Sequence, residues 1–204
     1  MNRIRIAAIV EGHGEVEAVP VLIRRIAAEI DPSLAPDIGP VIRVPANRLR
    51  KPGELERTVE FIARRLGGEG GVLILIDCDW KNGCPRWDSP DLLHRARSAR
   101  SDLPISLVLA YKEYEAWFIA ASDSLKGKHR LSEDLEIVED PEGIRGAKEW
   151  LSSRMPHNRP YAETIDQPAL SELFDLKAAR RARSFDKCYR EIVKLLTNLR
   201  AKDE

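Results

Sequence analysis

The chain has 204 residues, of which 43% are hydrophobic, and this length and composition suit one domain with a sizeable core. Lys and Arg together number 33, as do Asp and Glu, so the formal net charge is zero. Zero net charge excludes the strongly basic composition of a dedicated non-specific nucleic-acid binder. No apolar run approaches about 18 residues and the N-terminus lacks a basic-then-apolar signal pattern, so we expect neither a membrane span nor a secretory leader. The three cysteines have no close pairing, which predicts reduced thiols in a cytoplasmic protein.

Short apolar runs and amphipathic segments alternate over the first 124 residues. The apolar runs predict four strands, at Ile4–Val10, Val41–Val44, Val72–Ile76 and Ile105–Ala110. Apolar side chains at helical spacing predict helices at Glu15–Ile30, Pro52–Leu66, Asp91–Arg100 and Glu113–Ser122, with a loop over Trp80–Trp87. Such alternation is typical of an open parallel sheet of about four strands covered by helices on both faces.

The strand patterns stop after Ser124. Helical spacing continues at Gly143–Ser153, Ala169–Phe174 and Phe185–Arg200, with a proline-containing loop over Met155–Gln167. We therefore expect an α/β domain over residues 1–124 and a helical extension over residues 125–204 that packs on the same domain.

Acidic residues follow three of the four predicted strands. Glu11 ends the first strand, Asp77 and Asp79 end the third, and Glu113 and Glu115 follow the fourth. The carboxyl ends of parallel strands meet at one edge of a sheet, where ligands gather. Glu11 and Asp77 can share a ligand there only if strands one and three are neighbours, which requires the strand order 2-1-3-4.

Carboxylates grouped at buried strand ends repel one another and lose solvation, and a divalent cation is the usual compensation. We expect Glu11, Asp77 and Asp79 to bind one or two Mg²⁺ (or Mn²⁺) ions, with Glu113 and Glu115 completing a second position. Such ions activate a water nucleophile and neutralise the charge that develops on a phosphoryl group. Glu15, just outside this ligand set, is placed to act as general base.

Basic residues form a second feature, because residues 176–194 carry seven Lys and Arg against two acids. Their side chains could line a solvated helix face, or they could grip substrate phosphates beside the acidic site. The candidates for phosphate contact are Lys112, Arg180, Arg181, Arg183 and Lys187.

Other interpretations of these residues compete with metal chemistry. A lone acid after a strand is usually a helix cap or a solvated loop residue, and Glu15 alone suits the positive end of a helix. Gly12 and Gly14 could form a turn or phosphate loop, but Glu17 stands where the third glycine of a dinucleotide fingerprint belongs. The Asp-x-Asp pair also occurs in phosphatases that form an aspartyl-phosphate, although there it usually closes the first strand.

Glu-Gly after the first strand, Glu15 four residues after Glu11, and Asp-x-Asp after the third strand resemble the Toprim domain. That domain is shared by topoisomerases, primases and the overcoming-lysogenization-defect nucleases. The fuller pattern resembles a Toprim-like bacterial family known as a domain of unknown function of the 4276 type. The segments that carry this second resemblance are EYEAW at Glu113–Trp117, YAETIDQ at Tyr161–Gln167 and RSFDK at Arg183–Lys187.

The resemblance implies a Mg²⁺-dependent nuclease that cuts DNA or RNA within an anti-phage defence or DNA-maintenance system. Its implied partners are nucleic acid, an ABC- or SMC-like ATPase subunit and a second copy of the chain, with no membrane. Two alternatives stay open: a Toprim-fold subunit that binds an ATPase or nucleic acid without cutting, and a metal-dependent nucleotide phosphohydrolase.

Overall fold

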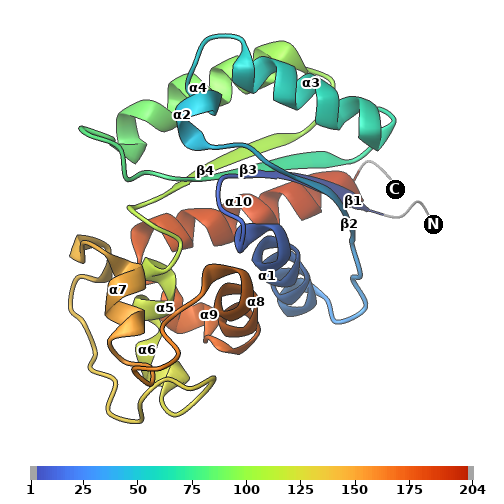
Figure 1. Cartoon of the computed structure of the whole chain (residues 1–204). Coiled ribbons are helices and arrows are strands. Elements are labelled where there is room, and N and C mark those ends of the chain that lie inside the picture. Colours follow the sequence, from blue (N-terminus) through green and yellow to red (C-terminus); the bar gives the residue numbers. More distant parts are fainter. Residues whose placement is uncertain (1–3, 202–204) are drawn as a thin grey trace.

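The four strands form one fully parallel sheet in the order β2-β1-β3-β4 in the computed structural model, which describes residues 4–201 (Figure 1). The predicted strand order is therefore confirmed, and β1 and β3 are neighbours, with Val10 opposite Leu75. Pro40, which cannot donate a ladder hydrogen bond, lies in the edge strand β2. The strands are β1 Arg5–Val10, β2 Asp37–Arg43, β3 Gly71–Asp77 and β4 Ile105–Ala110.

Helices cover both faces of this sheet, as the alternating sequence pattern predicts (Figure 1). Successive strand residues point to opposite faces, so Ile6 and Ala8 join one core while Ala7 and Ile9 join the other. One face is covered by α2 Ala46–Leu49, α3 Glu54–Leu66 and α4 Pro85–Ala99. The other face is covered by α1 Glu15–Ile30 and α10 Arg183–Arg200.

The helices after β4 share the second core with the sheet. Ser106 on β4 donates a hydrogen bond of 2.9 Å to Glu191 on α10, and Trp117 packs edge-on against Phe185. In Figure 1 these helices lie below the carboxyl edge of the sheet. They are α5 Ala116–Ala120, α6 Ser122–Leu125, the 3-10 turn Pro141–Gly143, α7 Ala147–Ser152, α8 Glu163–Leu173 and α9 Leu176–Ala179.

Several predicted bounds were wrong, and two helices begin earlier because an acidic side chain binds the backbone at their start. Asp88 accepts a hydrogen bond of 2.8 Å from the Cys84 N–H, so α4 begins inside the expected Trp80–Trp87 loop. Asp166 accepts one of 2.7 Å from the Ala162 N–H, so α8 begins inside the expected Met155–Gln167 loop.

Other differences are smaller. The second strand begins at Asp37 rather than Val41, and the expected helix Glu113–Ser122 is divided at Ala121 into α5 and α6. The expected helix Gly143–Ser153 shortens to α7. Within residues 4–201, none of the helices combines the length and the apolar character that crossing a membrane requires.

We expect Leu196→Ala to reduce the free energy of unfolding by about 2 to 5 kcal/mol, because it leaves a cavity under the sheet. Leu196 on α10 is buried in the core that the sheet shares with the later helices. Urea denaturation of the variant measures this loss, and Asn198→Ala at an exposed position of the same helix is the control. Two separate unfolding transitions would contradict a shared core.

Candidate functional site

Glu15 shapes the turn that follows β1. Its buried carboxylate accepts hydrogen bonds from the backbone N–H groups of Glu11 at 3.0 Å and Gly12 at 2.9 Å. Burial raises the pKa of Glu15 to about 7; the hydrogen bond from Gly12 opposes this rise and the nearby Glu115 carboxylate adds to it. Glu15 thus fixes the backbone from which Glu11 projects, and its role as a general base stays a prediction.

Asp77, at the end of β3, connects this strand to the segment after β4. Its carboxylate accepts a hydrogen bond of 2.9 Å from the backbone N–H of Tyr114. Burial raises the pKa of Asp77 well above its ordinary value, and the carboxylates of Glu15, Glu115 and Glu11 raise it further. The acids that follow three different strands therefore influence one another directly.

Glu115 is completely buried, and its two oxygens have different surroundings. Oε1 accepts a hydrogen bond of 2.9 Å from the Tyr161 hydroxyl and lies 4.0 Å from the Lys148 Nζ. Oε2 is buried with no hydrogen-bond partner within residues 4–201. Burial raises the pKa of Glu115 to about 7, although Lys148 acts against this rise.

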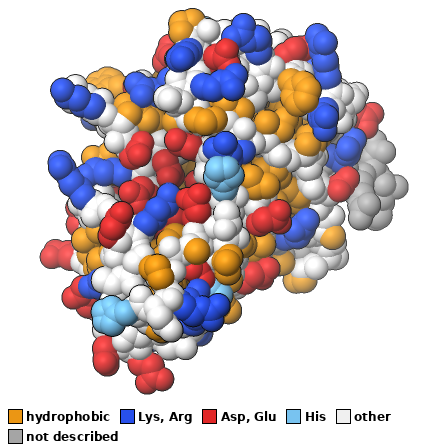
Figure 2. All heavy atoms as spheres, viewed as in Figure 1, with side chains coloured by type: hydrophobic (Ala, Val, Ile, Leu, Met, Phe, Trp, Pro, Cys, Tyr) orange, Lys and Arg blue, Asp and Glu red, His pale blue; other side chains and the backbone are white. Residues whose placement is uncertain are grey.

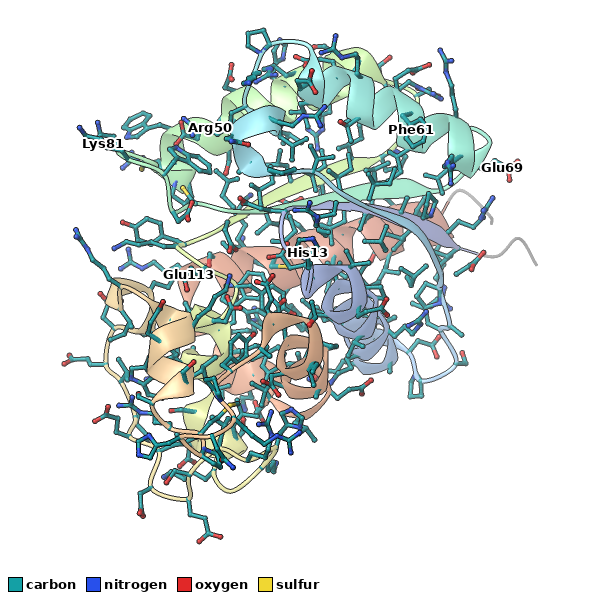
Figure 3. All side chains as sticks on the ribbon, in the orientation of Figure 1. His13, Arg50, Phe61, Glu69, Lys81 and Glu113 are labelled. Atoms are coloured by element: carbon teal, nitrogen blue, oxygen red, sulfur yellow. The ribbon has the colours of Figure 1, made fainter. Side chains whose placement is uncertain are left out.

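Lys148 on α7 supplies positive charge to the site. Its Nζ lies 3.1 Å from a Glu163 carboxylate oxygen, and its backbone N–H donates to Glu113 at 3.4 Å. Partial burial acts to lower the pKa of Lys148, but the neighbouring carboxylates, Glu115 foremost, raise it, so the amine stays protonated. Figure 3 shows His13 and Glu113 between the sheet and the helices α7 and α8.

Sequence reasoning missed Lys148 and did not assign roles to Tyr161 and Glu163. Tyr161 and Glu163 lie inside the YAETIDQ segment. The resemblance of this segment to a family pattern was the feature of the sequence that could have pointed to them as site residues. Lys148 follows no strand and belongs to no motif, and it reaches the acids only because α7 packs beside α5.

Glu11 and Asp79 lie on the more open side of the site. Glu11 is half-buried, yet its Oε2 is buried and has no partner among the described residues. Burial raises the pKa of Glu11, and the charge of Asp79 adds to this rise. Asp79 lines a cavity of about 620 Å³ together with Lys112, Glu113 and Arg145. Figure 2 shows acidic side chains grouped on this face, with basic ones around them.

No group of three or more His, Cys, Asp or Glu side chains within residues 4–201 is arranged closely enough to hold a metal ion. The metal ligands Glu11, Asp77, Asp79, Glu113 and Glu115 therefore stay a prediction. Two features nonetheless fit a cation: the carboxylates raise one another's pKa, and Glu11 and Glu115 each have a buried oxygen without a partner.

The two glycines after β1 allow close packing. A Cβ atom on Gly14 would lie 2.1 Å from the Gln167 Oε1 and 2.4 Å from the Glu163 carbonyl oxygen, so α8 packs directly on the start of α1. A Cβ on Gly12 would lie 3.3 Å from the Glu15 carboxylate. The expected turn is present, and its role in binding phosphate stays a prediction.

Two of the basic candidates are engaged within the protein. Arg181 donates hydrogen bonds to the carbonyl oxygens of Ala120, at the end of α5, and Val138, in the segment before the 3-10 turn, and so joins these two segments. Arg180 donates to Asp186 at 2.8 Å.

The other three basic candidates line cavities. Lys112 lies with Asp79 at the acidic site. Arg183 and Lys187 line a second cavity, between α4 and α10. The structure therefore brings Lys112 to the acidic group and places Arg183 and Lys187 beside it in a separate cavity.

The fold and the site define an α/β protein whose doubly covered parallel sheet carries a buried carboxylate group at the ends of β1, β3 and β4. A family model described as Domain of unknown function (DUF4276) matches residues 10–192, most of the chain, and the protein belongs to that family. No curated protein and no solved structure matches the chain.

We expect Gly14→Ala to reduce the free energy of unfolding by about 1 to 3 kcal/mol, because the added methyl group overlaps the start of α8. The backbone of Gly14 is helical, so alanine causes no conformational strain of its own. Urea denaturation measures the loss, and His13→Ala, an exposed neighbour, is the control. Equal stability of the two variants would contradict the direct contact between α1 and α8.

The metal-free protein should lose stability as the pH rises through 7. The folded pKa of Glu115 is about 7 against an ordinary value of 4.5, so its stabilising contribution is complete below about pH 4.5 and is lost above 7. In EDTA we expect this group to account for a fall of roughly 2 to 3 kcal/mol in the free energy of unfolding between pH 5 and pH 8.

Urea denaturation across this pH range, on wild type and Glu115→Gln, isolates the contribution of Glu115. The glutamine keeps an oxygen that can accept the Tyr161 hydroxyl but carries no charge. Between pH 5 and pH 8 the free energy of unfolding of Glu115→Gln should therefore fall by roughly 2 to 3 kcal/mol less than that of wild type. An equal fall in the two proteins would contradict the raised pKa of Glu115.

Proposed function

We propose that this protein is a Mg²⁺-dependent nuclease that cleaves phosphodiester bonds. The observation that carries the proposal is the burial of Glu15, Asp77 and Glu115 beside one another and beside Glu11. Ionised carboxylates that are buried together cost free energy unless positive charge lies beside them, and Lys148 supplies a single positive charge. A divalent cation is the partner that matches the remaining charge and the hard oxygen ligands.

The Toprim resemblance supports the same proposal. It rests on Glu11-Gly12 after β1, Glu15 at the start of α1, and Asp77 and Asp79 after β3. Acids at the ends of adjacent parallel strands are what a metal-dependent phosphodiester-cutting site of this kind requires. An anti-phage defence or DNA-maintenance system is the proposed setting, with an ABC- or SMC-like ATPase as partner.

In this proposal Glu11, Asp77 and Asp79 hold the metal, and Glu113 and Glu115 serve a second ion. When bound, Mg²⁺ lowers the pKa of a water molecule and neutralises charge on the phosphoryl oxygens.

The protein's own groups orient these ligands. The Tyr114 N–H fixes one oxygen of Asp77, and Glu15 fixes the backbone of Glu11. Lys148 keeps its proton and offsets part of the negative charge. Lys112 and Arg145 line the cavity that contains Asp79, and in this proposal they contact substrate phosphates.

We expect the wild-type protein to nick supercoiled plasmid DNA with Mg²⁺ or Mn²⁺ but not with EDTA, and Asp77→Asn to lower the rate at least about a hundredfold. Asparagine keeps the oxygen that accepts the Tyr114 N–H, so the fold is retained while one charged ligand is lost. Gel analysis of nicked and linear plasmid measures the rate. RNA of mixed sequence is assayed in parallel.

Glu17→Gln, at an exposed acid on α1, is the matched control and should cut as wild type does. Release of phosphate from nucleotides without plasmid or RNA cleavage would identify a phosphohydrolase instead. Well-folded protein that cuts neither nucleic acid would contradict the proposal and favour a non-catalytic subunit.

A further inference from the structure

A second cavity lies between the N-terminal turns of α4 and α10, next to the acidic site. Its volume is about 550 Å³, within the range of sites that enclose a small ligand. Tyr111, just after β4, lines both this cavity and the one that contains Asp79 and Lys112. Tyr111 is therefore a wall that the two cavities share.

The lining of the second cavity is cationic at its rim. Arg86, Arg183, Lys187 and Arg190 line it, against one carboxylate, Glu142. Glu142 is already engaged, because it accepts hydrogen bonds from two backbone N–H groups at the start of α10. The protein's own Glu142 thus caps the N-terminus of α10. An anion in the cavity would therefore be attracted by the basic side chains rather than by the helix N-terminus.

These four cations differ in how far the protein neutralises them. Lys187 and Arg190 pair with acids on their own helix, at 3.2 Å and 2.9 Å. The Arg183 guanidinium is exposed and makes no hydrogen bond or ion pair within residues 4–201. Arg86 lies over the Trp87 ring, with its Cζ 5.1 Å from the ring centroid. Arg183 is therefore the cation most free to bind a phosphate.

The interior of the cavity is mostly apolar, with one unsatisfied hydroxyl. Pro85, Pro90, Leu109 and Tyr111 supply apolar surface. Ser89, which also lines the cavity, is 8% exposed, and its Oγ has no hydrogen-bond partner within residues 4–201. A buried hydroxyl without a partner costs free energy, so a polar ligand atom is expected beside it.

We propose that this cavity binds one unpaired nucleotide of the substrate strand, with its phosphate at Arg183, its base on the apolar interior and a polar base atom at Ser89. The inference rests on the proposed nuclease function and adds the substrate class, because a base that is paired and stacked in a duplex must leave the stack before it can enter this cavity. Single-stranded nucleic acid, or a duplex opened at an end or a mismatch, is the preferred substrate.

Binding without cleavage tests the inference independently of the chemistry. Fluorescence anisotropy in EDTA compares a labelled dT12 strand, the same strand without bases, and a blunt duplex of equal length. The dT12 strand should bind at least about tenfold tighter than either, because each stacked base is worth about 1 to 3 kcal/mol. Arg183→Ala should weaken dT12 binding about tenfold, and Lys194→Ala, an exposed residue of the same helix outside the cavity, should leave it unchanged.

Equal affinity for dT12 and the strand without bases would overturn the base-binding role. Equal losses of dT12 affinity for Arg183→Ala and Lys194→Ala would show that the strand is attracted by the overall positive charge of the helix. That result would overturn a specific site at Arg183. Displacement of dT12 by micromolar nucleoside monophosphate would make a free nucleotide the occupant and overturn the strand assignment. If the protein binds dT12 as described but cuts nothing with Mg²⁺, the nuclease proposal is refuted and the nucleotide-binding cavity stands. If the protein cuts nucleic acid but Arg183→Ala does not change dT12 binding, the cavity proposal is refuted and the nuclease proposal stands.

Discussion

Repulsion among buried carboxylates is the constraint on which the rest of this structure depends. Glu15, Asp77 and Glu115 come from three different chain segments, and each is at least nine-tenths buried. Proteins seldom bury such acids together, because each loses its hydration and raises the pKa of the others. The fold offsets part of this cost with backbone N–H groups, the Tyr161 hydroxyl and the Lys148 amine. A site that keeps so costly a group of acids is a strong candidate for function.

The later helices complete this site as well as covering the sheet. Lys148 comes from α7, and Tyr161 and Glu163 lie at the start of α8. The absence of a side chain at Gly14 lets α8 approach the turn after β1. Residues of the region after 124 therefore bring the positive charge and the hydroxyl donor that the acids of the α/β region lack.

The proposed chemistry and the proposed binding cavity use neighbouring parts of one edge of the sheet. Acids occupy the ends of β1 and β3, while the cations of α4 and α10 lie beyond Tyr111. This separation of charge is what would let a chain of zero net charge hold both the proposed cation site and the proposed phosphate site. The match to the DUF4276 family model, over residues 10–192, includes the residues of both the acidic site and the second cavity.

The sequence by itself determined the parallel sheet and the acids that follow β1, β3 and β4, because strand patterns and strand ends are local. The order 2-1-3-4 followed only from the assumption that Glu11 and Asp77 share a ligand, and the structure confirms it. The sequence also placed α1 correctly at Glu15–Ile30. Only the tertiary structure decided that Glu15 binds the backbone of its own turn, that Arg181 holds carbonyl groups, and that Lys148 joins the acids. These contacts depend on how α7 and α8 pack, and such packing joins residues far apart in the chain that no local spacing connects.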